Sequence, residues 1–169
     1  MDPLVVWREG PMTLAEAVER YGEVPVAEGL LNGLLKLLPT RLGFVLVPGA
    51  KGRLAMGMSR HYTPRPSTME DGVAVRRQVE VLQRKGYRVL WRTLRRALLE
   101  REGERVLVVS GLNRRGSRMG YRNQGAERVV LLVPEGGTGP RQRKKVEYVE
   151  VCLGRSPGHE GPAGNPGAA

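Results

Sequence analysis

A run of arginines between residues 113 and 123 is the part of the sequence best suited to chemistry. It reads NRRGSRMGYRN and contains no acidic residue. Guanidinium groups bind phosphate oxygens with two parallel hydrogen bonds, glycines let the backbone approach a phosphate, and a tyrosine can stack on an unpaired base. The run is either a solvated loop between strands or a loop that grips a nucleic-acid backbone. We predict the second, through Arg114, Arg115, Arg118, Tyr121 and Arg122.

A second basic cluster, RQRKK, occupies residues 141–145. Such a run is often only a solvated turn. If it lies on a hairpin next to the first run, it extends the same positive surface. The residues predicted to do so are Arg141, Arg143, Lys144 and Lys145.

The overall charge supports a polyanionic partner. The chain has 169 residues and a net charge of +11. Residues 1–70 carry 8 basic and 7 acidic groups, whereas residues 71–169 carry 20 basic and 10 acidic groups. A bias toward arginine can come from base composition alone, but that bias does not explain a surplus of bases over acids. We therefore expect the second half to contact nucleic acid.

Catalytic signals are few. His61 and Tyr62 share a proline-bounded loop with two arginines, and this grouping could supply an acid and a base for RNA cleavage. One cysteine and two distant histidines give no spacing suited to zinc, and the sequence contains no phosphate-binding or dinucleotide-binding motif. We predict no metal and no cofactor. Glu70 and Asp71 are explained as acidic residues at the start of a helix.

The elements that must position these residues centre on residues 72–109. Apolar spacing predicts a helix over residues 72–85, a strand over 87–91, a second helix over 93–102 and a buried strand over 105–109. Residues 93–102 could instead form a long hairpin. Further strands are expected over residues 126–133 and 146–153.

The first half is predicted to begin with a strand over residues 4–7. A helix follows, capped by Thr13 with Glu16 as the partner of a capping box. The leucine-rich residues 26–38 predict a core helix ended by Pro39, with a dimer interface as the alternative. Residues 44–47 and 53–58 are expected to form a hairpin.

These elements predict an α+β fold with helices on one face of a mostly antiparallel sheet. The order at the start is that of the ferredoxin-like split βαβ unit, with extra C-terminal strands. We expect a single basic domain over residues 1–153 and a disordered Gly/Pro/Ala tail over residues 154–169. The single cysteine, the lack of a secretory signal and the lack of a long apolar run predict a cytoplasmic protein without membrane contact.

Two local resemblances bear on function. Residues 86–91 and 105–111, followed by the Arg-rich run, resemble the closing strands of bacterial mRNA-interferase toxins of the RelE-like superfamily, which implies metal-independent RNA cleavage. The chain departs from that family in its extra length and in residues 93–102. Residues 75–91 resemble the last helix and strand of very-short-patch repair endonucleases. The acidic metal ligands of that family have no counterpart upstream here, which argues against such a nuclease.

We therefore predict a nucleic-acid-binding protein, with RNA slightly favoured over DNA. The first alternative is a metal-independent ribonuclease of the mRNA-interferase type that uses His61 and Tyr62. The second is an adaptor or inhibitor that binds an acidic protein, or a homodimer, through the helix predicted over residues 26–38.

Overall fold

The computed structural model describes residues 5–113, 125–136 and 145–154, and these residues form two compact units. Unit 1 contains the described residues up to Met69 together with Gly154. Unit 2 contains those from Glu70 to Leu153.

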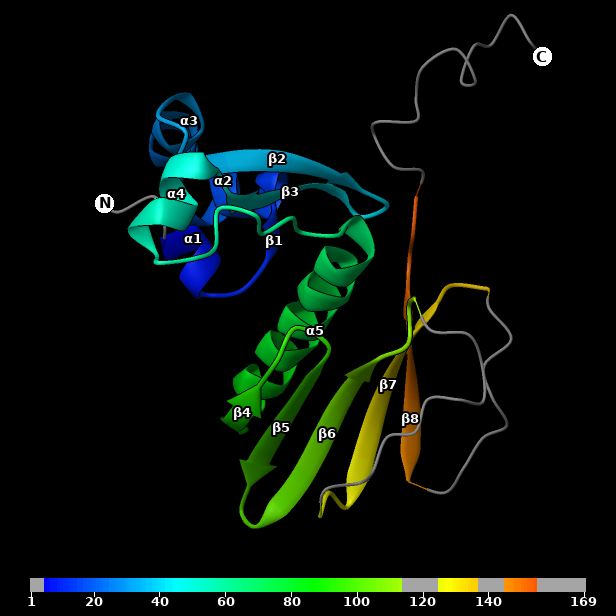
Figure 1. Ribbon diagram of the computed structural model, residues 1–169. Helices are drawn as coiled ribbons and strands as arrows, with labels where there is room; N and C mark the ends of the chain where they lie inside the picture. Colours follow the sequence, from blue (N-terminus) through cyan, green and yellow to red (C-terminus); the bar gives the residue numbers. More distant parts are fainter. Residues whose placement is uncertain (1–4, 114–124, 137–144, 155–169) are drawn as a thin grey trace, which may run out of the picture. The chain divides into compact units, whose positions relative to one another are not determined.

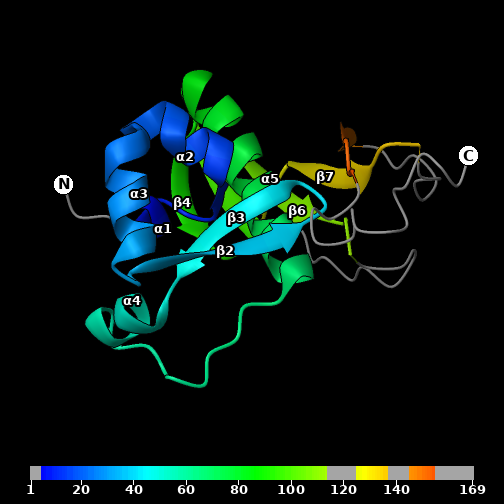
Figure 2. The same cartoon turned by 90° about the horizontal axis from the view of Figure 1, so that it is seen from above.

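Unit 1 is a small helical layer on a three-stranded sheet (Figure 1). Figure 2 shows helices α2 and α3 following one another beside the hairpin of strands β2 and β3. In chain order the elements are α1 (Val5–Arg8), β1 (Met12–Thr13), α2 (Leu14–Tyr21), α3 (Glu23–Leu31), β2 (Leu35–Thr40), β3 (Gly43–Pro48) and α4 (Ala50–Ala55).

Helix α2 begins with the capping box that the sequence predicts. The Thr13 hydroxyl accepts a hydrogen bond from the backbone N–H of Glu16 at 3.2 Å, and the Glu16 carboxylate accepts one from the backbone N–H of Thr13 at 3.0 Å. The helix ends at Gly22, whose φ of 87° is accessible to glycine at little cost. Gly22 also precedes α3, so one glycine makes the turn between the two helices.

The sheet of unit 1 is antiparallel and has the order β1-β3-β2. Strand β1 pairs with β3 at Met12 and Leu46, and β2 pairs with β3 over six residues. One face of this sheet packs on the helices. The buried side chains of that core are Met12, Ala17, Val26, Leu35 and Leu46.

Three predictions for this unit are wrong. Residues 26–38 do not form one helix, because α3 ends at Leu31 and the chain turns at Gly33, whose φ is 73°. The leucines that follow belong to β2, the edge strand of the sheet, where Pro39 is tolerated because the strand pairs on one side only. Residues 53–58 are not the partner of β3, since β2 takes that place, and the predicted first strand is helix α1.

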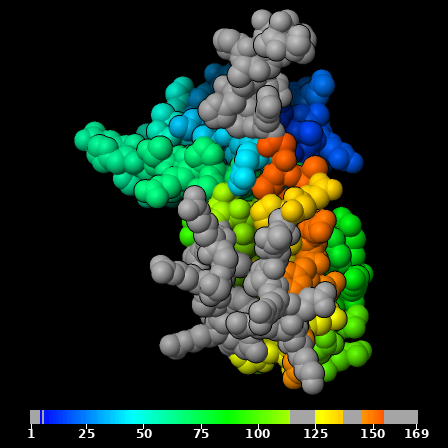
Figure 3. All heavy atoms as spheres, turned by 90° about the vertical axis from the view of Figure 1, so that its right-hand side faces the viewer, coloured from blue at the N-terminus to red at the C-terminus, as the bar shows by residue number. Residues whose placement is uncertain are grey.

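Unit 2 contains a five-stranded sheet, and the boundary between the units falls inside its long helix. The strands have the order β4-β5-β6-β7-β8; β4, β5 and β6 are antiparallel neighbours, whereas β7 is parallel to β6 and β8 is parallel to β7. Figure 3 faces the edge formed by β8, in orange beside β7 in yellow. The elements are α5 (Pro66–Arg84), β4 (Arg88–Arg92), β5 (Arg96–Arg101), β6 (Glu104–Ser110), β7 (Arg128–Pro134) and β8 (Val146–Val151).

Helix α5 covers one face of this sheet (Figure 1). Its buried residues Val75, Val79 and Leu82 follow the predicted helical spacing and pack on the middle strands. Arg76 and Glu80, four residues apart on this helix, form an ion pair with Nη1 and Oε1 2.9 Å apart. Arg76 is buried, so this pair neutralises a charge inside the unit.

The α+β class is confirmed, and so are the strands predicted on either side of residues 93–102. The helix predicted over those residues is wrong, and the alternative of a hairpin is right: β4 and β5 are antiparallel and joined by residues 93–95. The strands that a ferredoxin-like order would unite belong to two different sheets. The expected tail lies outside the described residues except for Gly154.

Candidate nucleic-acid interface

The first candidate surface is the pair of helices in unit 1. Helices α2 and α3 are joined by a single glycine, and the antiparallel hairpin β2–β3 follows them directly. The short strand before the helices pairs with the last strand of the hairpin. This order resembles that of a helix-turn-helix followed by a hairpin wing, although one residue replaces the usual turn of three to four. In proteins with that arrangement, the second helix or the wing can reach a DNA groove.

The arginine-rich residues predicted to grip phosphates lie outside the described residues, and their prediction stays untested. This holds for Arg114, Arg115, Arg118, Tyr121, Arg122, Arg141, Arg143 and Lys144. Lys145 is described. It is exposed at the start of β8, and its carbonyl oxygen accepts a hydrogen bond from the backbone N–H of Val129 at 2.9 Å.

The described residues just before the Arg-rich run belong to a cluster of polar side chains. The Ser110 hydroxyl donates a hydrogen bond to Oδ1 of Asp71 at 2.5 Å, and Arg95 Nε lies 3.3 Å from Oδ2 of the same carboxylate. Asn113 donates from Nδ2 to Oε1 of Glu70 at 3.3 Å. Two adjacent carboxylates of α5 therefore hold the chain on both sides of residue 111.

The carboxylate of Asp71 is buried to an unusual degree for a charged group. Asp71 and Ser110 are each 2% exposed, whereas the side chain of Arg95 is 40% exposed. Burial raises the pKa of Asp71 above its ordinary value of 3.8, and the hydrogen bond from Ser110 and the charge of Arg95 act in the opposite direction. Desolvation is thus the largest effect on this group, and its partners compensate for part of it.

This cluster, which we call the Asp71 cluster (Glu70, Asp71, Arg95, Ser110 and Asn113), lies at the carboxyl end of β6. Strands β6 and β7 are parallel there, and the backbone N–H of Gly111 donates to the carbonyl of Leu132 at 2.7 Å. The carboxyl ends of parallel strands are common positions for ligands. Within the described ranges, no group of three histidine, cysteine or acidic side chains is placed to hold a metal ion. The contacts of this cluster fix the position of Asn113, the first residue of the Arg-rich run.

The sequence interpretation missed this cluster. Glu70 and Asp71 were expected at a helix start, but α5 begins at Pro66 and both residues are buried in its second turn. Asp71 and Ser110 are 39 residues apart, and only the packing of α5 on β6 brings them together. Two neighbouring acids inside an otherwise apolar helical pattern were the signal that could have indicated buried partners.

The catalytic candidates His61 and Tyr62 lie in the segment between α4 and α5. His61 is exposed and Tyr62 is half-buried, and their backbone N–H groups both donate to Ser59, at its hydroxyl and its carbonyl oxygen. Burial raises the pKa of Tyr62. A phenol with a raised pKa is a weaker general acid at neutral pH, so this change does not favour the predicted role.

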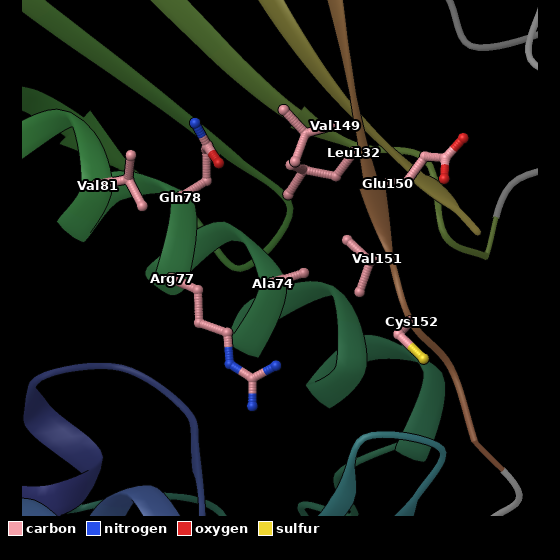
Figure 4. Close-up of a pocket in the computed structure, with 9 residues that line it drawn as sticks. All are labelled: Ala74, Arg77, Gln78, Val81, Leu132, Val149, Glu150, Val151 and Cys152. Atoms are coloured by element: carbon pink, nitrogen blue, oxygen red, sulfur yellow. The ribbon is translucent and has the colours of Figure 1, made fainter.

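A shallow groove of about 250 Å³ is a further feature of unit 2 (Figure 4). Ala74, Gln78 and Val81 of α5 form one wall, and Val149 and Val151 of the edge strand β8 form the other. Glu150 and the exposed thiol of Cys152 lie at its rim. The hydrogen bond and the charge of Glu135 raise the pKa of this thiol, so the neutral thiol is favoured over the thiolate.

Comparisons with protein-family models, with curated proteins and with solved structures give no match for this chain. Among the helices that the structure describes, none is both long and apolar enough to span a lipid bilayer. The arrangement of the described residues and their charges is therefore the basis for a functional proposal.

Proposed function

We propose that this protein binds nucleic acid and that double-stranded DNA is its ligand. The observation that carries the proposal is the order of α2, Gly22, α3 and the β2–β3 hairpin in unit 1. In a helix-turn-helix with a hairpin wing, either the second helix or the hairpin can be the rigid element that meets a duplex.

The same observation favours DNA over the RNA that the sequence suggested. The major groove of B-form DNA is wide enough for an α-helix or a two-stranded ribbon. The major groove of A-form RNA is deep and narrow, and single-stranded RNA is usually held on exposed aromatic side chains. The hairpin of unit 1 exposes one aromatic residue, Phe44, among its described side chains, which is a poor stacking platform.

The charge of the chain is the independent support. A net charge of +11 attracts a polyanion, and the surplus of basic residues lies mainly after residue 70. In unit 2 the Asp71 cluster holds the residue before Arg114, so the Arg-rich run begins from a fixed point. We propose that this run adds phosphate contacts that are independent of base sequence.

The test is binding of the full chain to a labelled DNA duplex and to single-stranded RNA of the same sequence across a salt series. We expect tighter binding to the duplex than to the RNA. We also expect the logarithm of the association constant to fall linearly with the logarithm of the salt concentration, with a slope of about −0.9 for each phosphate contact. Failure to bind the duplex, or an affinity that does not respond to salt, would contradict the proposal. Equal binding to RNA would remove the preference for DNA.

A second candidate is protein binding by unit 1. Val24 and Leu31 of α3 are 67% and 86% exposed, and Glu23 and Glu28 accompany them on the helix surface. Exposed apolar side chains flanked by carboxylates suit a basic partner rather than the acidic partner predicted from sequence. A pull-down from lysate that survives nuclease treatment and is lost in Leu31→Ser would favour this candidate.

A further inference from the structure

The charges of unit 1 are separated along its chain. Residues 5–28, which contain α1 to α3, carry two arginines and five glutamates. Residues 29–69, which contain the hairpin, α4 and the following segment, carry six basic residues and no acidic residue. A polyanion is therefore repelled by the first part of the unit and attracted by the second.

Helix α3 is in the position of a recognition helix but has the wrong surface for that role. Its exposed side chains offer no N–H or O–H donor: they belong to Glu23, Val24, Ala27, Glu28 and Leu31. Phosphate oxygens need donors, and two carboxylates facing a phosphate backbone repel it. This helix is thus a poor element to place in a groove of DNA.

Three basic residues, Lys36, Lys51 and Arg53, belong instead to the base of the hairpin and to the helix that follows it, where β2 begins and β3 ends. The aliphatic part of Lys51 lies against Gly33, at about 3.8 Å from the position of a β-carbon there. Arg53 donates from Nη1 to the carbonyl oxygen of Pro48 at 3.3 Å, which ties α4 to the end of β3. Lys36 is exposed on β2, where its backbone pairs with Val47. Figure 2 shows α4 beside this end of the two strands.

Two more basic residues follow along the chain. Arg60 and Arg65 are both exposed in the segment between α4 and α5. The sixth basic residue, Arg41, is at the opposite end of the hairpin, where its carbonyl oxygen accepts a hydrogen bond from Gly154.

We infer that unit 1 contacts the DNA backbone through the basic surface formed by Lys36, Lys51, Arg53, Arg60 and Arg65, and that α3 stays out of the groove. The inference rests on the proposed function and specifies which face of unit 1 meets the ligand. The contacts are with phosphates, so they position the duplex without reading its sequence. Each contact contributes about tenfold to the affinity at about 0.1 M salt, through counterion release.

The experiment compares three variants of the full chain on one labelled duplex. The first changes the five residues of the basic surface to glutamine. The second is a control of equal charge that changes five exposed basic residues of unit 2 to glutamine: Arg84, Lys85, Arg88, Arg92 and Arg105. The third changes Glu23, Val24 and Glu28 of α3 to alanine. Far-ultraviolet circular dichroism and thermal melts establish that each variant is folded.

We expect the first variant to lose about tenfold in affinity for each contact removed. The slope of log affinity against log salt concentration becomes shallower by about 0.9 for each contact. The control loses much less, and the α3 variant binds as tightly as the wild type or more tightly. Equal losses in the first two variants would mean that only net charge matters, and a large loss in the α3 variant would place that helix in the interface; either result overturns the inference.

Two further outcomes keep this inference separate from the proposed function. If the wild type binds no duplex, the proposed function fails and the inference fails with it. If the wild type binds and the first variant binds equally well, the inference alone fails. Because Arg53 has a structural hydrogen bond, a four-residue variant that retains Arg53 serves if the full set does not fold.

Discussion

The hydrogen bond from Ser110 to Asp71 stabilises unit 2 by an amount that depends on pH. Both side chains are buried, and Ser110 Oγ lies 2.5 Å from the carboxylate oxygen. A hydrogen bond to a charged group contributes about 1.5–3 kcal/mol, and one between neutral groups contributes about 0.5–1.5 kcal/mol. We therefore expect Ser110→Ala to lower the free energy of unfolding by about 2 kcal/mol when Asp71 is charged and by about 1 kcal/mol when it is protonated.

The direction of this pH dependence follows from the pKa of Asp71. Burial raises that pKa in the folded state above the ordinary value of 3.8, so the charged carboxylate costs stability that is recovered as pH falls through the folded-state pKa. The hydrogen bond from Ser110 lowers the pKa, and its removal raises it further. The destabilisation by Ser110→Ala is thus largest near neutral pH and decreases toward acid pH.

The assay is urea unfolding followed by the fluorescence of Trp91, which belongs to unit 2. A Trp7→Phe background removes the signal of unit 1. The free energy of unfolding is measured with and without Ser110→Ala at about pH 7.5 and about pH 4. Val108→Ala is the matched control, because Val108 is buried in the same strand and loses only apolar contacts.

We expect the effect of the control to be the same at both pH values. An effect of Ser110→Ala that is equally independent of pH would refute the reasoning, since the hydrogen bond would then not involve a titrating carboxylate. An effect smaller than about 0.5 kcal/mol at neutral pH would also refute it, because the carboxylate would then be adequately solvated without Ser110.

Three other substitutions test single features, each by urea or thermal unfolding. Thr13→Ala removes the cap of α2 and is expected to cost about 1 kcal/mol in unit 1, followed by Trp7 fluorescence. Gly49→Ala places a β-carbon 2.4 Å from the carbonyl oxygen of Gly33, so the backbone must shift and a loss of about 1–3 kcal/mol is expected; no loss would contradict that packing. Arg88→Ala breaks an exposed ion pair with Glu100 and is expected to change stability by less than about 0.5 kcal/mol, and a larger loss would show that the pair is more than a surface contact.

The sequence predicts elements whose signals are local. The capping box at Thr13 depends on residues three positions apart, and the structure has both of its hydrogen bonds. The spacing of Val75, Val79 and Leu82 identifies the buried side of α5. The apolar runs of β6 and β7 are buried in the middle of a sheet, where continuous apolar sequence is typical of parallel strands.

Two helices predicted from composition are wrong because a turn ends or divides the segment. The leucines of residues 30–38 suit a helix, yet Asn32 and Gly33 end α3 and the same apolar side chains continue in a strand. In unit 2 the strong helix formers of residues 93–102 belong to β5. There Glu102 and Gly103 both have positive φ, at 51° and 81°, and make the two-residue turn that joins β5 to β6.

The Asp71 cluster could not be predicted from short stretches of sequence, because its members are far apart along the chain. Glu70 and Asp71 have an adequate explanation as acids near a helix start, and nothing nearby in sequence contradicts it. Their burial depends on which strand α5 meets, and Ser110 is 39 residues away from Asp71. The turn before β5 that brings Arg95 to the carboxylate was itself mistaken for a helix.

In unit 1, the wrong prediction of one helix over residues 26–38 concealed a charge pattern that the sequence contains. The absence of acids over residues 29–69 can be read from the sequence, but averaging over residues 1–70 cancels it against the glutamates of the first helices. A single helix over residues 26–38 would have put Lys36 two turns from Glu28, on an element of mixed charge. The turn at Gly33 separates the two: it leaves the carboxylate on α3 and carries the lysine into the hairpin, where α4 brings Lys51 against the start of the same strand. That turn therefore produces the separation of charge on which the proposed phosphate contacts of unit 1 depend. The binding experiment with the α3 variant tests whether DNA responds to this separation.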